Sequence, residues 1–153
     1  FSMVFISLLL VSAFIDLDTM ELPDEISLAC AITGLVYGIM VKNSLLFPIL
    51  GAAAGFLLMY IICKTGGAIY KKEALGGGDI KLAAATGTFL GWQGFFLSVY
   101  LAFFLAFIVL LPALLAGARK KQDSVPFGPA LAAGAVIAFL YGSAIWNWYA
   151  GVL

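Results

Sequence analysis

Long apolar runs separated by short polar stretches dominate the hydrophobic pattern of this chain. Six runs can be marked, with edges defined to within a few residues, at 1–16, 26–42, 45–63, 79–91, 94–116 and 127–149. The runs are continuous and do not alternate apolar with polar positions, which favours helices over strands. A helix needs about 20 mostly apolar residues to cross a bilayer, and it satisfies its own backbone groups there. The pattern therefore predicts an all-α, polytopic membrane bundle of about six transmembrane helices, with the lipid bilayer as its surroundings.

Composition supports the membrane assignment and excludes several kinds of binding and catalysis. The chain is 64% apolar and only 10% charged, whereas a soluble domain has about 25% charged residues. Its eight basic and eight acidic residues form no basic patch with interleaved aromatics, so we expect no nucleic-acid partner. There is no histidine, which removes imidazole zinc ligands and His-activated nucleophiles, and we expect no metal site. Cys30 and Cys63 lie inside apolar runs and are interpreted as packed apolar residues, with a disulfide or redox pair as the less favoured alternative.

The chain reads as one membrane domain over residues 1–153, because no linker or soluble segment divides it. Its first run is short, does not begin with Met and lacks the charged start of a signal peptide. We therefore expect that one or more N-terminal spans precede it in the natural protein. Positive charges gather in the third and fifth loops, at Lys64, Lys71, Lys72, Arg119, Lys120 and Lys121. Since cytoplasmic loops are enriched in Lys and Arg, the first, third and fifth loops are predicted to be cytoplasmic.

All carboxylates fall on this predicted cytoplasmic side. They are Asp16, Asp18, Glu21, Asp24, Glu25, Glu73, Asp79 and Asp123. Asp16 closes the first run and Asp79 opens the fourth, so the topology places both at one membrane depth. Two carboxylates that share a site cannot both ionise without cost, so such a pair holds one proton. An aspartyl protease requires that arrangement, because one carboxylate activates water and the other polarises the scissile carbonyl.

The alternative is that both aspartates are solvated helix-end acids, with Asp79 complementing a helix dipole. The three glycines before Asp79 bear on this choice, because glycine lets another backbone approach closely. The glycines would leave room for an extended substrate strand beside Asp79. Close packing of small residues between helices is the alternative explanation of the three glycines. Lys81, two residues after Asp79, points to another helix face and is expected to pair with an acid or to reach the interface.

The segment Gly76-Gly77-Gly78-Asp79 fits the GxGD signature of intramembrane aspartyl proteases. The longer string ALGGGDIKL (residues 74–82) resembles the version found in type IV prepilin peptidases. FIDLD (residues 14–18), LPD (residues 22–24) and VPFGP (residues 125–129) resemble further motifs of that family, in the right order. The resemblance covers nearly the whole chain. Presenilin-like proteases share GxGD and a Pro-Ala-Leu element, but that tripeptide occurs twice here and those enzymes need more spans.

The resemblance implies an aspartyl endopeptidase with Asp16 and Asp79 as its catalytic pair. Asp18 and Asp24 remain alternatives for the first acid, although helix-end position and motif spacing favour Asp16. Gly76, Gly78 and Asp24 are expected to contact the substrate, and the acidic first loop is expected to attract a basic leader. Solvated loop acids are the alternative explanation of that loop.

The implied substrate is a type IV prepilin or a type II secretion pseudopilin, cleaved where its basic leader meets a hydrophobic helix. The implied location is the bacterial inner membrane, with the active site facing the cytoplasm. The peptidase step needs no cofactor. Larger family members also carry cysteine pairs that bind zinc and are associated with N-methylation from S-adenosylmethionine, and this chain lacks those pairs, which leaves methyltransferase activity open. A small carboxylate-dependent transporter or an assembly subunit is the alternative function, and the sequence does not indicate an oligomeric state.

Overall fold

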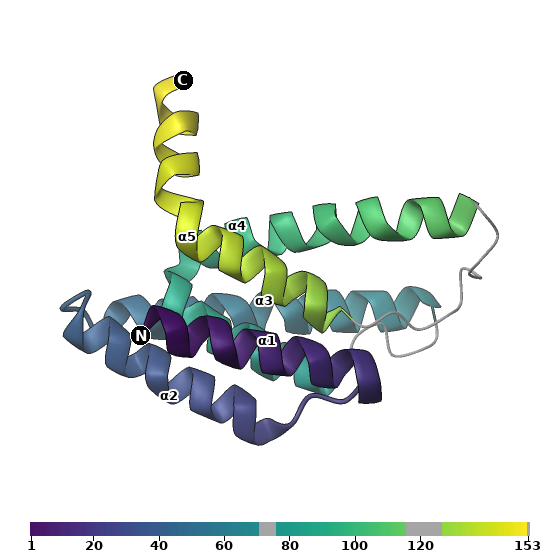
Figure 1. The fold of residues 1–153 in the computed structure, drawn as a ribbon, viewed down its shortest axis with the longest axis horizontal. Coiled ribbons are helices and arrows are strands. Elements are labelled where there is room, and N and C mark those ends of the chain that lie inside the picture. Colours follow the sequence, from purple (N-terminus) through teal and green to yellow (C-terminus); the bar gives the residue numbers. More distant parts are fainter. Residues whose placement is uncertain (71–75, 116–126, 153) are drawn as a thin grey trace.

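The computed structural model describes residues 1–70, 76–115 and 127–152, and in these ranges the chain is helical without strands. The helices are α1 (Ser2–Thr19), α2 (Asp24–Met40), α3 (Leu46–Tyr70), α4 (Gly77–Leu115) and α5 (Gly128–Val152) (Figure 1). Four of them hold stretches long and apolar enough to cross a membrane, namely Ser2–Thr19, Leu46–Gly66, Gly77–Val109 and Gly128–Tyr149. The predicted all-α membrane bundle is confirmed.

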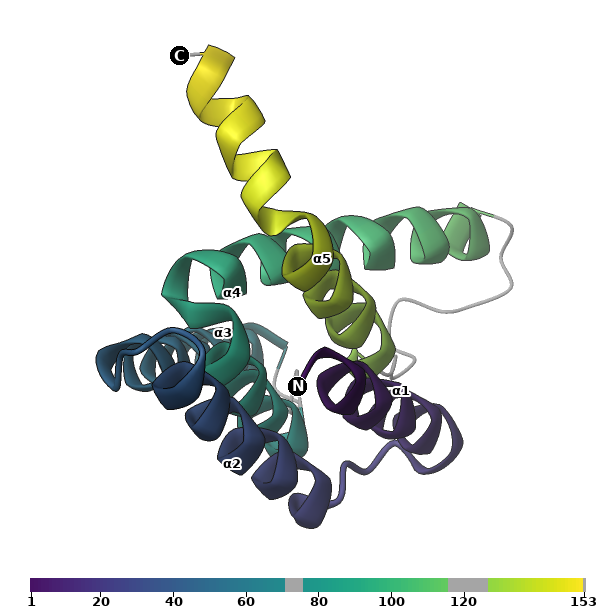
Figure 2. The same ribbon diagram turned by 60° about the vertical axis from the view of Figure 1, so that its left-hand side comes forward.

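A break at Gly91 reconciles the six predicted runs with five helices. Gly91 has φ 66° and ψ 175°, a conformation that only glycine adopts readily. The ring of Phe47 packs against it, so that a Cβ at position 91 would lie 2.5 Å from the Phe47 Cε2 atom. The two limbs of α4 therefore leave Gly91 in different directions (Figure 2). The fourth and fifth predicted runs correspond to these limbs, and the other four runs correspond to single helices.

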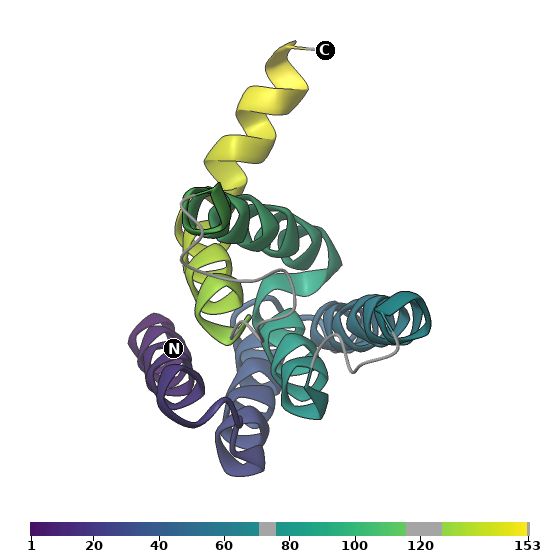
Figure 3. The same cartoon turned by 90° about the vertical axis from the view of Figure 1, so that its right-hand side faces the viewer.

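The first limb of α4 lies at the centre of the bundle. Helix α4 packs against α3, α5 and α2, while α1 packs against α5 and α2 (Figure 3). Gly51 of α3 and Gly87 of α4 lie so close that a Cβ on either would collide with the carbonyl of the other. Helices in lipid gain little from the hydrophobic effect and associate through close packing of small residues of this kind. The glycines thus fix the position of α4 against α3.

Aromatic side chains hold α1 against α4 at one end of the bundle. Phe5 and Phe89 are fully buried, and their rings stack with centroids 4.3 Å apart. Phe139 of α5 packs beside both rings. This cluster and the glycine contacts define how the helices that carry the acidic residues are placed.

Candidate active site

Asp16 lies in the last turns of α1, and its side chain is only 5% exposed. Its Oδ2 atom accepts a hydrogen bond of 2.9 Å from the backbone N–H of Gly128, the first residue of α5. The first N–H groups of a helix have no partner within the helix, and negative charge is favourable there. Gly128 allows this approach, because a Cβ at that position would lie 2.5 Å from the Asp16 Oδ2 atom. Asp16 thus caps a helix other than its own.

Asp79 lies in the first turn of α4 and is 8% exposed. Its Oδ2 atom accepts a hydrogen bond of 3.3 Å from the N–H of Gly76, which precedes the helix. The contact resembles a capping box, in which an acid in the first turn reaches back to the helix start. The Oδ1 atom of Asp79 is buried and has no hydrogen-bond partner in the described part of the chain. One oxygen of Asp79 therefore stabilises the helix start, and the other remains available.

The structure brings Asp16 and Asp79 together at one end of the bundle. Asp16 comes from α1 and Asp79 from the first limb of α4. The two carboxyl groups lie close enough for their charges to interact. The neighbouring candidate acids Asp18 and Asp24 are exposed, whereas Asp16 is buried. Burial and proximity therefore favour Asp16 as the partner of Asp79, as the sequence analysis predicted. That both act in catalysis stays a prediction.

The glycines before Asp79 occupy different surroundings. Gly78 packs against the loop after α1, and a Cβ on it would lie 2.8 Å from the Leu22 Cβ atom. Gly77 has no atom within 4 Å of such a Cβ, and Gly76 has only the Asp79 Oδ2 atom, at 3.8 Å. Gly78 is thus already in contact with protein, while Gly76 is exposed. Their expected contact with substrate stays a prediction.

Asp24 is the first residue of α2 and is paired with Lys81 of α4. The Nζ atom of Lys81 donates to both carboxylate oxygens of Asp24, at 2.7 and 2.6 Å. The predicted pairing of Lys81 is therefore present. The expected substrate contact of Asp24 stays a prediction, and in this structure its carboxylate is occupied by Lys81.

Gly128 is the site residue that the sequence analysis did not single out. It belongs to the VPFGP segment, whose first two residues, 125 and 126, lie outside the described ranges. A glycine at the start of a helix, inside a motif shared with a family, was the available signal. Its hydrogen bond to Asp16 could not be foreseen, because the two residues belong to helices far apart in the sequence.

Part of the predicted topology also lies outside the described residues. This holds for the loop residues Lys71, Lys72, Glu73, Arg119, Lys120, Lys121 and Asp123. The orientation of the chain across the membrane therefore stays a prediction. Among the residues that the structure describes, no group of three or more His, Cys, Asp or Glu side chains could hold a metal ion. Cys30 is buried and Cys63 is half-buried.

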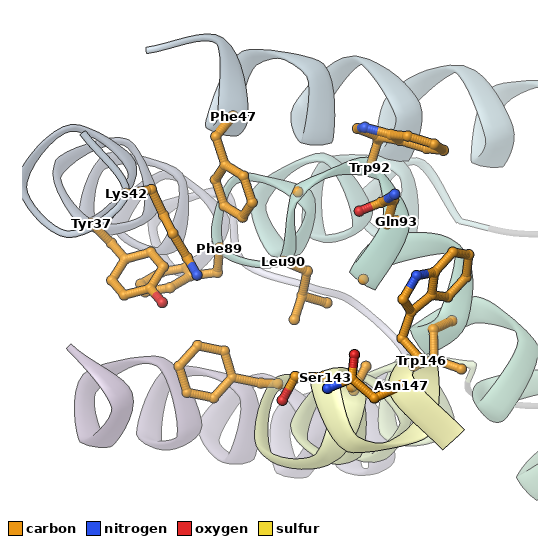
Figure 4. Close-up of a pocket in the computed structure, with 16 residues that line it drawn as sticks. Tyr37, Lys42, Phe47, Phe89, Leu90, Trp92, Gln93, Ser143, Trp146 and Asn147 are labelled. Atoms are coloured by element: carbon orange, nitrogen blue, oxygen red, sulfur yellow. The ribbon is translucent and has the colours of Figure 1, made fainter. Parts of the chain in front are cut away.

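A separate cavity of about 440 Å³ lies at the other end of the bundle. It is lined by the end of α2, the start of α3, the Gly91 break and the middle of α5 (Figure 4). Lys42 reaches over the rings of Tyr37 and Phe47 there, and Gln93 and Asn147 add polar groups. No carboxylate lines this cavity. It is therefore distinct from the aspartate site, which remains the candidate for catalysis.

Fold and site together define a multi-pass helical membrane protein with two buried, interacting aspartates at one end of the bundle. Comparison with known proteins identifies the family within this class. The chain belongs to the type IV leader peptidase family, whose model matches residues 3–111. The family is named for leader peptidases, and not for transporters or assembly subunits.

Several relatives carry the name prepilin leader peptidase/N-methyltransferase. The protein of Aeromonas hydrophila is 35% identical over 89% of this chain and 47% of its own length. That of Bacillus subtilis (strain 168) is 35% identical over 97% of this chain and 58% of its own length. That of Legionella pneumophila is 32% identical over 99% of this chain and 53% of its own length. The chain thus spans about half the length of the curated relatives it matches. No solved structure gives a significant match.

Proposed function

We propose that this chain is the catalytic membrane domain of an aspartyl endopeptidase that removes the leader from type IV prepilins or pseudopilins. The observation that carries the proposal is the meeting of two buried aspartates, Asp16 and Asp79, at one end of the bundle. Ionisable residues inside membrane helices are costly and generally serve function. The family assignment supports the same chemistry.

In the proposed mechanism the two carboxylates share one proton and divide the work of peptide hydrolysis. The ionised carboxylate removes a proton from water, which attacks the scissile carbonyl carbon. The protonated carboxylate donates a hydrogen bond to the carbonyl oxygen and so stabilises the tetrahedral intermediate. The C–N bond then breaks, and the carboxyl group that took the proton from water gives it to the departing amine, which returns the pair to its starting protonation state. No metal or cofactor enters these steps.

The hydrogen bonds suggest which aspartate is ionised. Asp16 accepts a bond of 2.9 Å from Gly128 at a helix N-terminus, which favours negative charge. Asp79 accepts a longer bond of 3.3 Å and keeps a buried Oδ1 atom without a described partner. A buried charged oxygen without a donor is costly. We therefore assign the base to Asp16 and the proton to Asp79, with Oδ1 as the group that meets the substrate carbonyl.

The substrate proposal rests on where the acids lie. Asp18, Glu21 and Glu25 are exposed around the loop that follows α1, close in sequence to Asp16 and without a basic residue among them. A cluster of this kind attracts positively charged segments. A prepilin whose basic leader rests there would place its leader–helix junction near the aspartates. The proposal includes the bacterial inner membrane and a cytoplasmic active site. Methyl transfer, which the relatives' names include, would require S-adenosylmethionine and is not part of it.

Cleavage of a model prepilin in detergent or membranes tests the proposal, with wild type, Asp16→Asn, Asp79→Asn and Asp18→Asn compared. We expect Asp16→Asn and Asp79→Asn each to abolish cleavage while the helical content and elution volume of the protein stay unchanged. If Asp18→Asn is inactive and Asp16→Asn still cuts, the first acid is Asp18. If Asp16→Asn and Asp79→Asn both cut, the protease proposal is wrong.

A further inference from the structure

The ion pair between Asp24 and Lys81 joins two segments that lie next to the two catalytic aspartates. Asp24 starts α2, shortly after the end of α1 that carries Asp16, and Lys81 follows Asp79 by two residues in α4. The pair is bidentate, with contacts of 2.7 and 2.6 Å, and it is the only ion pair among the described residues. The ion pair therefore links the start of α2, which follows the helix of Asp16, to the first turns of α4, which carry Asp79.

Helical geometry places Asp79 and Lys81 on opposite faces of the first turns of α4. Two residues correspond to a rotation of about 200° around a helix with 3.6 residues per turn. Asp79 accordingly faces the buried side and interacts with Asp16, whereas Lys81 is 56% exposed and reaches α2. A contact that holds Lys81 therefore limits rotation of this part of α4, and with it the direction of Asp79.

From Leu82 to Gly91 α4 is largely buried against its neighbours, but the glycine segment before Asp79 has few restraints. Gly76, Gly77 and Gly78 have no side chains to anchor the helix start, and the surroundings of Gly77 are open. The packing of Gly78 against Leu22 is the second restraint. Leu22 lies in the loop after α1 and Asp24 is the first residue of α2, so both restraints come from the connection between α1 and α2 and the residue that follows it.

Stability alone does not explain the pair. Both side chains are largely exposed, at 56% and 68%, and exposed ion pairs contribute little to folding. Catalysis is more sensitive than folding stability to the orientation of a reacting group, because a displacement of about 1 Å can lower a rate by about a hundredfold.

We propose that Asp24 and Lys81 are positioning residues that, with the Leu22–Gly78 contact, hold α4 in the rotation that aims Asp79 at Asp16. This inference rests on the proposed peptidase function and assigns Asp24 a role in place of substrate binding. Neither residue takes part in proton transfer.

Steady-state cleavage of a model prepilin tests the inference. The variants are Asp24→Asn, Lys81→Gln and the exchanged pair Asp24→Lys/Lys81→Asp. Lys64→Gln is the matched control, since Lys64 lies over the Tyr60 ring, 5.4 Å from its centroid, and has no carboxylate partner among the described residues. Each single change should lower kcat about tenfold with little change in KM, because the bound substrate meets a misdirected acid. The exchanged pair should recover most of kcat, and the thermal midpoint of unfolding should stay near that of the wild type.

Three results would overturn the inference. The first is a wild-type kcat in both single variants. The second is a raised KM with unchanged kcat in Asp24→Asn and no effect of Lys81→Gln, which would return Asp24 to substrate binding. Loss of activity in the single variants without recovery in the exchanged pair would also count against it. Wild type and Asp16→Asn are assayed alongside, so that a wild type that does not cut reports failure of the proposed function instead.

Discussion

The ring of Phe5 in α1 stacks on the ring of Phe89 in α4, with centroids 4.3 Å apart. Asp16 follows Phe5 by eleven residues in its helix, and Asp79 precedes Phe89 by ten in the other. At about 1.5 Å per residue these steps amount to roughly 16 and 15 Å along two helices that run in opposite directions. The aromatic contact at one end of the bundle therefore sets the register that brings the two carboxylates to the same level at the other end.

Phe5→Ala should destabilise the fold and reduce cleavage together. Loss of the buried ring leaves a cavity and removes dispersion contacts, which costs about 2 kcal/mol or more even where lipid replaces water. Unfolding by SDS in mixed micelles measures the change. Phe107→Ala serves as the control, because Phe107 is 60% exposed on α4 and its loss should leave stability nearly unchanged. Equal effects of the two substitutions would show that the Phe5–Phe89 contact has no special part in the register.

Gly128→Ala should reduce cleavage strongly and leave the helical bundle folded. The new Cβ would lie 2.5 Å from the Asp16 Oδ2 atom, so the carboxylate or the start of α5 must move. We expect kcat to fall by about tenfold or more, since catalysis requires both acids in place. Gly142→Ala is the matched control in α5, because its Cβ would meet only the Leu97 Cδ2 atom at 3.7 Å. Wild-type kcat in Gly128→Ala would contradict the described geometry around Asp16.

Gly78→Ala and Gly77→Ala should behave differently although the residues are adjacent. A Cβ at position 78 would lie 2.8 Å from the Leu22 Cβ atom, whereas a Cβ at position 77 would meet nothing within 4 Å. We expect Gly78→Ala to lower kcat, and Gly77→Ala to retain it and to stabilise the helix start slightly. Cleavage rates of the two purified variants provide the comparison. Loss of activity in Gly77→Ala alone would indicate that the open space there receives the substrate.

Neutralising Glu21 and Glu25 should weaken cleavage of a basic-leader substrate only at low ionic strength. The double variant Glu21→Gln/Glu25→Gln removes two exposed charges from the acidic loop segment. We expect kcat/KM to fall severalfold at about 0.01 M salt and the difference to vanish near 1 M, where screening extends over about 3 Å. A substrate with a neutralised leader is the control and should not distinguish the variant from wild type. Unchanged cleavage at low salt would show that these carboxylates are simply solvated.

The lipid surroundings, the helices and the set of reactive groups could all be predicted from the hydrophobic pattern and the motifs. Long apolar runs require lipid and helical backbone, and this requirement is local, so the predicted edges agree with the observed helices to within a few residues for α1 and α5. The GxGD and LPD segments indicated the family before any contact was known. The boundary between the predicted runs 79–91 and 94–116 falls at Gly91, where the structure has a break within α4.

Which of these groups lie together depends on how the helices pack, and this could not be predicted from the pattern of residues along the chain. Asp16 and Asp18 are the same residue type two positions apart, yet one is buried and the other exposed, because only one face of α1 packs against its neighbours. The Gly128 N–H on Asp16, the Leu22 contact of Gly78 and the Lys81 partner of Asp24 join segments distant in sequence. Their pairing depends on the register and rotation of packed helices. Those follow from glycine contacts such as Gly51–Gly87 and from the Phe5–Phe89 stack, which no periodicity within a single helix encodes.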